Sequence, residues 1–279
     1  MLPVCPTAPI NQNLQKKAVI LINQIGISSS CYYPQYTEVS FQKVCDSEAA
    51  VAEIFFNSLS ELEPAFVKNL ADRAQASGTR VAAVHPFGSF TEGFWLFSNY
   101  RRRYEDSLEL CKKFFATMNI LGAKIFVLHG CKLEARVDDD FYAETFASLV
   151  QLARQYGVIF AQENIVHYKS QSIEFLQKLK NTVGEDFRMV FDVKQARRAG
   201  VDAYDYLDKL GDAVCHMHVS DFNAEKDCIP PGEGLFDFKK LFAYMQSIGY
   251  AGDYMIELYN HSYRDETQIA NALRYLKNL

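Results

Sequence analysis

Residues 138–164 read DDDFYAETFASLVQLARQYGVIFAQEN, a helical pattern followed by a short apolar run. The pattern starts with three acids, where the helix dipole favours negative charge, and Gly157 marks its end. The run that follows, Val158–Asn164, is typical of a buried strand. A helix and a strand in this order form half of the alternation from which parallel sheets are built.

The same alternation extends along the chain and predicts eight strands. The strand candidates are Val19–Ile25, Val51–Phe56, Arg80–His85, Lys124–His129, Val158–Asn164, Arg188–Asp192, Val214–Val219 and Tyr254–Leu258. Helical patterns cover Glu63–Ala76, Tyr104–Leu121, Phe236–Ile248 and Asp265–Leu279, and the interval between the first two strands has the weakest pattern. Eight such units, without a Gly-x-Gly-x-x-Gly motif after the first strand, predict an α/β fold, the single-domain (β/α)8 TIM barrel. We assign residues 1–17 to an N-terminal leader and residues 18–279 to the barrel.

Composition and charge exclude several classes of protein. The chain has 279 residues, is 49% hydrophobic and carries a formal net charge of −5, with no Lys/Arg run longer than Arg101–Arg103, which argues against a nucleic-acid partner. No apolar stretch reaches the length of a signal peptide or a membrane helix, so we expect a cytoplasmic protein without a membrane partner. The seven cysteines form no Cys-x-x-Cys pair, which favours reduced thiols.

Most of the predicted strands end in a titratable side chain. These residues are Glu53, His85, His129, Glu163, Asp192, His216 or His218, and Glu257. Unpaired buried carboxylates are costly, and a bound cation satisfies several of them at once. Carboxylates with one imidazole suit Mn²⁺ or Mg²⁺, and the histidine also permits Zn²⁺ or Co²⁺. His216 and His218 point to the same face of their strand, so alternation alone leaves either as the ligand.

Several of these strand-end residues also have common structural roles. Asp192 can cap the helix that follows it. His85 and His129 can be hydrogen-bonded core histidines. Glu53 is more typical of a solvated or ion-paired barrel residue than of a catalytic one.

Other polar and aromatic residues lie in the loops and helix starts. Lys194 and Arg197 could meet a phosphate or a carboxylate, although solvated helix-start residues are more common. Trp95 is either ordinary packing or an apolar wall over a substrate. His167 and His261 are expected at the surface.

Seven short motifs follow one another along the predicted strands. They are VHPFG (84–88), FVLHG (126–130), FAQENI (160–165), MVFDVKQA (189–196), HMHVSD (216–221), PPGEG (230–234) and MIELY (255–259). Their order and spacing resemble the xylose-isomerase-like barrel superfamily, which includes the sugar phosphate isomerase/epimerase family and the endonuclease IV family. The resemblance extends from about the first strand to the last helix.

This resemblance implies one divalent metal ion held by Glu163, Asp192, His218 and Glu257. It selects His218 over His216 because the family's His-x-x-Asp pattern matches His218 and Asp221. It also implies that Glu163 and Glu257 move a proton on opposite faces of the substrate. The residues expected to contact the substrate are His85, His129, Gln195, Trp95 and His216.

The chain departs from the family pattern at four places. Gln195 replaces the histidine of the Asp-x-x-His motif, which argues against further metal ions. Asp227 is followed by Cys228 and lacks the endonucleases' Asp-x-His pair. Ala224 and Lys169 stand where the ketose 3-epimerases have an arginine and a glutamate, so that subfamily's mode of substrate recognition is not expected.

The preferred function is therefore a metal-dependent isomerase or epimerase acting on a sugar, a sugar phosphate or a polyol through an enediolate. A lyase that dehydrates a keto-polyol at the same site is the main alternative. An endonuclease IV-type hydrolase and a barrel that binds a ligand without turnover are two further alternatives. By the resemblance, a homo-oligomer is also expected.

Overall fold

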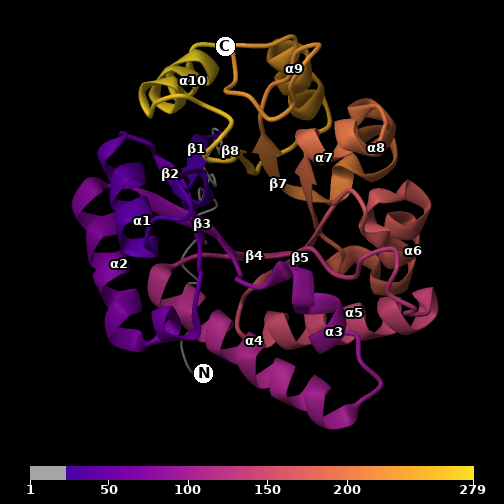
Figure 1. The fold of residues 1–279 in the computed structure, drawn as a ribbon. Coiled ribbons are helices and arrows are strands. Elements are labelled where there is room, and N and C mark those ends of the chain that lie inside the picture. Colours follow the sequence, from indigo (N-terminus) through magenta and orange to yellow (C-terminus); the bar gives the residue numbers. More distant parts are fainter. Residues whose placement is uncertain (1–22) are drawn as a thin grey trace, which may run out of the picture.

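The computed structural model describes residues 23–279 as eight parallel strands that close into a barrel in chain order, with β8 paired to β1 (Figure 1). The strands are β1 (Ile25–Ser28), β2 (Val51–Phe55), β3 (Arg80–His85), β4 (Ile125–Leu128), β5 (Ile159–Glu163), β6 (Met189–Asp192), β7 (Val214–Val219) and β8 (Asp253–Ile256). The predicted (β/α)8 TIM barrel is confirmed. The predicted leader lies outside the described residues.

Helices surround the ring of strands on the outside (Figure 1). They are α1 (Thr37–Asp46), α2 (Pro64–Ser77), α3 (Glu92–Trp95), α4 (Arg101–Leu121), α5 (Asp139–Gln155), α6 (Ile173–Val183), α7 (Val193–Arg198), α8 (Ala203–Leu210), α9 (Phe238–Ser247) and α10 (Thr267–Lys277). Their ends follow local signals, as in α5, where the Asp138 side chain accepts hydrogen bonds from the backbone N–H groups of Asp140 and Phe141. The interval with the weakest helical pattern does contain a helix, α1.

The first strand differs from its predicted range. β1 runs from Ile25 to Ser28 and shares only Ile25 with the prediction, of which residues 19–22 lie outside the described part. Gly26 explains why this segment pairs with β2, because a Cβ atom at Gly26 would lie 2.3 Å from the carbonyl oxygen of Val51. The register then sets Ser28 beside Glu53.

The barrel interior has an apolar layer beneath a polar one. Ala83, Val127, Ala161 and Val190 are buried together, and each lies two residues before a polar strand-end residue. Because side chains alternate along a strand, both sets point into the barrel. The polar strand ends therefore rest on a dry apolar floor at the carboxyl-terminal end of the barrel, where TIM barrels place their active sites.

The main apolar core lies between the strands and the outer helices. Aromatic side chains from four elements meet there, and the rings of Phe126 and Phe160 stack with centroids 5.1 Å apart.

Among residues 23–279, no helix is both long and apolar enough to cross a membrane. The six cysteines in this part of the chain are free thiols.

Candidate metal centre

Four polar side chains from adjacent strands converge at the carboxyl-terminal end of the barrel. Glu163 ends β5, Asp192 ends β6, His218 lies near the end of β7, and Glu257 follows β8. One nitrogen or oxygen atom from each lies within 4.8 Å of the others. Only Glu257 has appreciable exposure among the four, with 14% of its side-chain surface accessible against 1% or less for the rest. The centre therefore opens to solvent on the Glu257 side.

Asp192 has two roles, one for each carboxylate oxygen. Its Oδ1 accepts hydrogen bonds from the backbone N–H groups of Lys194 (2.7 Å) and Gln195 (3.2 Å), which caps helix α7. Its Oδ2 is buried and accepts no well-directed hydrogen bond from the described residues, although Lys194 Nζ is 3.1 Å away. Both predicted roles of Asp192 are thus compatible in one side chain.

His218 lies between carboxylates on both sides of its ring. Nδ1 is 3.0 Å from Glu163 Oε1 and 3.5 Å from Glu257 Oε2, whereas Nε2 is 3.0 Å from Glu53 Oε2. Burial lowers the pKa of His218, but these three carboxylates raise it well above its usual value. Without a metal ion, the imidazole is therefore protonated, and each of its two nitrogens lies next to a carboxylate.

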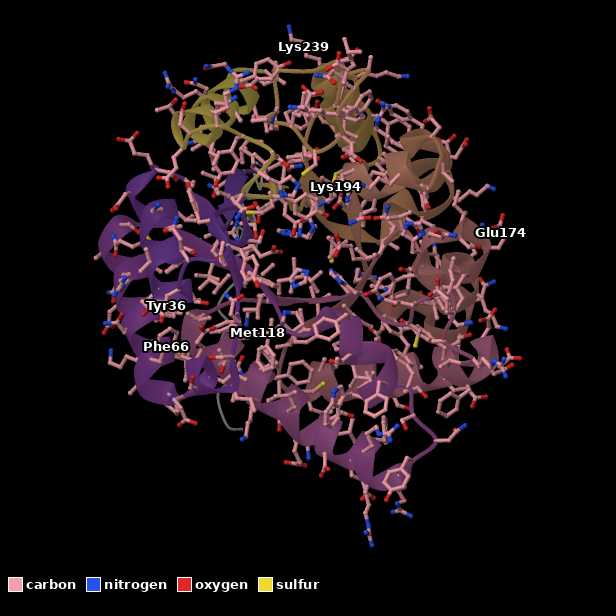
Figure 2. The ribbon with its side chains drawn as sticks, in the orientation of Figure 1. Tyr36, Phe66, Met118, Glu174, Lys194 and Lys239 are labelled. Carbon is pink, nitrogen blue, oxygen red and sulfur yellow. The ribbon has the colours of Figure 1, made fainter. Side chains whose placement is uncertain are left out.

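Lys194 brings a second cation into the cluster. Its side chain is 2% exposed, and Nζ lies 2.9 Å from Glu257 Oε2 as well as 3.1 Å from Asp192 Oδ2. Figure 2 shows Lys194 toward the middle of the ring of helices, whereas Glu174 and Lys239 lie at its periphery. The expectation that Lys194 is a solvated residue is wrong, because the turn that starts α7 directs it at the carboxylates. Arg197, three residues later, is exposed as expected.

The carboxylates respond differently to this environment. Burial raises the pKa of Asp192 to about 6, an effect that Lys194 only partly offsets. Burial also raises the pKa values of Glu163 and Glu257, but His218 outweighs it at Glu163, and Lys194 with His218 outweighs it at Glu257. Both glutamates are thus held ionised, as proton acceptors must be.

A histidine pair forms the rim next to Glu163. His85 Nε2 and His129 Nε2 are 2.8 Å apart, and His129 Nε2 is 3.0 Å from Glu163 Oε2. His85 Nδ1 lies 3.2 Å from the carbonyl oxygen of Pro86, which can only accept, so this nitrogen carries the proton and Nε2 is an acceptor. Burial and the neighbouring His129 also lower the pKa of His85. His129 is therefore the donor of the pair, and 18% of its side chain is exposed to the mouth of the barrel.

The chemistry of the four converging residues fits a divalent metal ion. Glu163 Oε2 and Asp192 Oδ2 are buried oxygens without a well-directed hydrogen bond from residues 23–279, which is the state of an oxygen that can coordinate a cation. Three carboxylates and one imidazole form a mostly hard donor set. Two further groups, Glu53 with His216 and His218, and His85 with His129 and Glu163, have ligand atoms equally close but share members with the first.

The remaining predicted substrate contacts lie outside the converging four. Gln195 is buried, and its Oε1 accepts a hydrogen bond from the backbone N–H of Val166 at 3.2 Å. His216 has no exposed surface, and its ring lies against Glu53, with Nε2 3.4 Å from Oε2. Trp95 is 41% exposed and lines a mainly apolar cavity of about 380 Å³ with Leu59 and Phe87.

Sequence reasoning underrated Glu53. Its side chain is fully buried, accepts a hydrogen bond from Ser28 Oγ at 2.9 Å and meets His218 on the other side. The signal was present in β2, where one charged residue stands in the middle of the buried run VAEIF. Two apolar neighbours on either side place it inside the barrel rather than in solvent.

Asp221 organises the long loop after β7. Its Oδ1 accepts hydrogen bonds from the backbone N–H groups of Phe222 and Phe236, and its Oδ2 from those of Gly232 and Gly234. A Cβ atom at Gly234 would lie 2.3 Å from Asp221 Oδ1. Gly234 therefore leaves the space that the Asp221 carboxylate needs in this loop.

The family model described as "Xylose isomerase-like TIM barrel" matches residues 41–279. The chain belongs to this family. Inosose dehydratase of Clostridium perfringens is 22% identical over 266 residues, which cover 83% of this chain and 85% of that relative. A D-tagatose 3-epimerase-like protein has the same fold, with a TM-score of 0.75, 20% identity and coverage of 91% and 96% of the two chains. The IOLI protein with a bound zinc atom has a TM-score of 0.71, 17% identity and coverage of 91% and 95%. At such identities, the solved structures establish the fold.

Proposed function

We propose that this xylose isomerase-like barrel is an enzyme that moves a proton next to the carbonyl group of a sugar, a sugar phosphate or a polyol, as an isomerase or epimerase. The observation that carries this proposal is the convergence of Glu163, Asp192, His218 and Glu257 within 4.8 Å at the open end of the barrel. These four residues would hold one divalent ion, Mn²⁺ or Mg²⁺ by ligand type, with Zn²⁺ or Co²⁺ as alternatives. When bound, the ion would polarise the substrate's carbonyl and hydroxyl oxygens and stabilise an enediolate.

Glu163 and Glu257 are the residues proposed to carry the proton. Both are held ionised in a water-poor centre, and they come from β5 and from the end of β8, which β6 and β7 separate. A base on each face of a planar enediolate can remove a proton from one side and return it on the other, which inverts a carbon centre. His129 stands on the rim with 18% of its side chain exposed and is proposed to contact the substrate.

The apolar floor beneath these groups serves the same chemistry. Ala83, Val127, Ala161 and Val190 exclude water from below, so the charges of the centre act in a low-dielectric environment. Such an environment strengthens the interaction of fixed charges with a developing enediolate. Contacts of the substrate with Gln195, Trp95 and His216 stay predictions, separate from the converging ligand set.

Dehydration of a keto-polyol is the second candidate. A relative similar over most of this chain is named an inosose dehydratase. Dehydration of a keto-polyol can begin with the same proton removal next to a carbonyl group.

The test combines metal analysis with proton exchange. Elemental analysis of the wild type and of Glu257→Gln, both purified without chelator, should give about one divalent ion per chain and a reduced amount in the variant. A panel of ketoses and keto-polyols in D₂O is then followed by NMR, and the wild type should catalyse deuterium incorporation next to the carbonyl. Glu109→Gln, on the outer helix α4, controls for the loss of one carboxylate.

The outcomes separate the candidates. A new epimer or isomer indicates the preferred reaction, and loss of water indicates the lyase. About three zinc ions per chain with salt-dependent DNA binding would instead favour an endonuclease. A loaded protein that exchanges no substrate proton would overturn the enzymatic proposal and favour a binding barrel.

A further inference from the structure

Lys194 occupies the position from which a cation can satisfy two of the proposed ligands at once. Its ammonium lies 3.1 Å from Asp192 Oδ2 and 2.9 Å from Glu257 Oε2, and both carboxylates belong to the proposed ligand set. The Lys194 side chain is 2% exposed, so water cannot take over these contacts. The ammonium is therefore the counter-ion of these two oxygens when no metal ion is bound.

A divalent ion and this ammonium cannot both keep these contacts. An ion coordinated by both oxygens at about 2.1 Å would lie no more than about 5 Å from Nζ. Two cations so close in a buried centre repel each other strongly, because the surroundings screen them poorly. The ion also competes for the Glu257 Oε2 lone pair to which the ammonium donates its hydrogen bond, and for the Asp192 oxygen with which it forms an ion pair.

We propose that the Lys194 ammonium is an internal competitor of the metal ion, bound to Asp192 and Glu257 in the metal-free protein and displaced from them when the centre is loaded. This inference rests on the metal centre of the proposed function and adds a means by which the chain itself sets the affinity of that centre. Metal binding is then weaker than the four ligands alone would give. The metal-free barrel, in turn, stays stable with its carboxylates buried.

The surroundings of Nζ offer a place for the displaced ammonium. Nζ lies 4.8 Å from the centre of the Tyr259 ring, whose face attracts a cation. Tyr259 also borders a polar cavity of about 620 Å³, lined by the acids Glu225 and Asp227 and by the cations Arg197, Arg198 and Lys226. A rotation of the flexible lysine stem past the Tyr259 ring toward this polar cavity takes the ammonium away from the metal ion.

The closing experiment measures Mn²⁺ affinity from the EPR signal of the free ion, with wild type, Lys194→Met and Lys194→Gln. The matched control is Arg198→Gln, which removes one positive charge from the same helix, near the same Tyr259 ring, but from an ion pair with Asp227 outside the ligand set. We expect both Lys194 variants to bind Mn²⁺ at least tenfold more tightly than the wild type. Arg198→Gln should stay within about twofold.

Thermal unfolding provides a second readout. Without metal, the Lys194 variants should melt at a lower temperature than the wild type, because two buried carboxylates lose their counter-ion. Saturating Mn²⁺ should raise their melting temperature by more than it raises that of the wild type. If the wild type binds Mn²⁺ and both Lys194 variants bind it no more tightly than the wild type, the proposed competition is wrong. The proposed metal centre is unaffected by that result. Failure of every protein to bind Mn²⁺ or Zn²⁺ would remove the metal centre itself.

A measurement on the unaltered protein covers the case in which the variants do not fold. A buried lysine ammonium in two ion pairs exchanges its protons slowly and gives a sharp ¹⁵Nζ NMR signal, which Lys194→Arg identifies by its loss. Stoichiometric Zn²⁺ should shift or broaden this signal as the ion pairs break. An unchanged signal in a Zn²⁺-loaded protein would overturn the proposal.

Discussion

Oε2 of Glu53 lies 3.0 Å from Nε2 of His218, on the edge of the imidazole that faces away from Glu163. The contact joins β2 to β7 across the interior of the barrel. A carboxylate at this nitrogen fixes the ring orientation and leaves Nδ1 as the coordinating nitrogen. Glu53 is therefore a positioning residue for the proposed ligand.

Glu53→Ala should weaken metal binding by about 10- to 100-fold, the usual effect of removing the partner of a ligating histidine. Glu53→Gln should lose less, because its amide oxygen can still accept a hydrogen bond from His218 Nε2 while its NH₂ group faces the Ser28 hydroxyl, which can accept. Calorimetric titration with Mn²⁺ measures both. Unchanged affinity in Glu53→Ala, in a protein with normal circular dichroism, would show that His218 needs no such partner.

The two roles of Asp192 can be separated by substitution. Asp192→Asn keeps an oxygen that can cap α7 but loses the charge, whereas Asp192→Ala loses both. Both variants should lose metal affinity by more than tenfold. Only Asp192→Ala should lose the cap, which costs about 1 kcal/mol of unfolding free energy beyond Asp192→Asn, as measured by urea denaturation. Equal stability of the two variants would show that the cap contributes nothing.

Glu92 makes the stability of the fold depend on pH. Burial raises its pKa to about 7, although its Oε2 accepts hydrogen bonds from the backbone N–H groups of His129 and Gly130. An acid whose pKa is raised in the folded protein stabilises it when protonated, and this contribution is lost as the pH rises from about 4.5 through about 7.

Glu92→Gln resembles the protonated acid and should therefore gain on the wild type as the pH rises. Between pH 5 and pH 8, the difference in unfolding free energy should change in favour of the variant by up to about 3 kcal/mol. Urea denaturation across this range provides the measurement, and Glu109→Gln on the outside of α4 should show no such change. A constant difference across the range would mean that Glu92 does not titrate there.

Asp221 should be intolerant even of asparagine. All four of its hydrogen bonds come from backbone N–H groups, and an amide would turn an NH₂ group toward two of them. We expect Asp221→Asn to lose about 3 kcal/mol of unfolding free energy and to open residues 222–236 to proteolysis. Asp237→Asn, at the cap of α9, is the control and should change stability by less than about 0.5 kcal/mol, because asparagine caps equally well.

The order of strands and helices could be predicted because the two elements have different patterns even over a short stretch of sequence. Strands show apolar or alternating runs, whereas helices show apolar residues with a 3.6-residue period. The exception, β1, shows the limit of this reasoning. The described strand is Ile25–Ser28, where Gly26 allows the backbone of Val51 to approach closely, and that contact depends on the partner strand. The apolar character of a run alone does not predict which residues pair with the neighbouring strand.

The converging set was predictable because parallel strands bring their carboxyl ends together, so strand-end residues far apart in sequence become neighbours. Lys194 was not, because a lysine two residues after a strand is usually solvated, and only the turn into α7 directs it inward. The role of Glu53 required the three-dimensional arrangement that brings its side chain on β2 to His218 on β7 inside the barrel. Contacts across the barrel are not visible in local patterns.

The cap of helix α7 gives the centre a spectroscopic label of its own. The backbone amides of Lys194 and Gln195 both donate to Asp192 Oδ1, while Oδ2 of the same carboxylate faces the site. Any event that changes the charge or orientation of this carboxylate changes the electronic environment of the two amide groups. The ¹H and ¹⁵N shifts of these two residues therefore read out the occupancy of the barrel mouth, without a probe being attached and without turnover of any substrate.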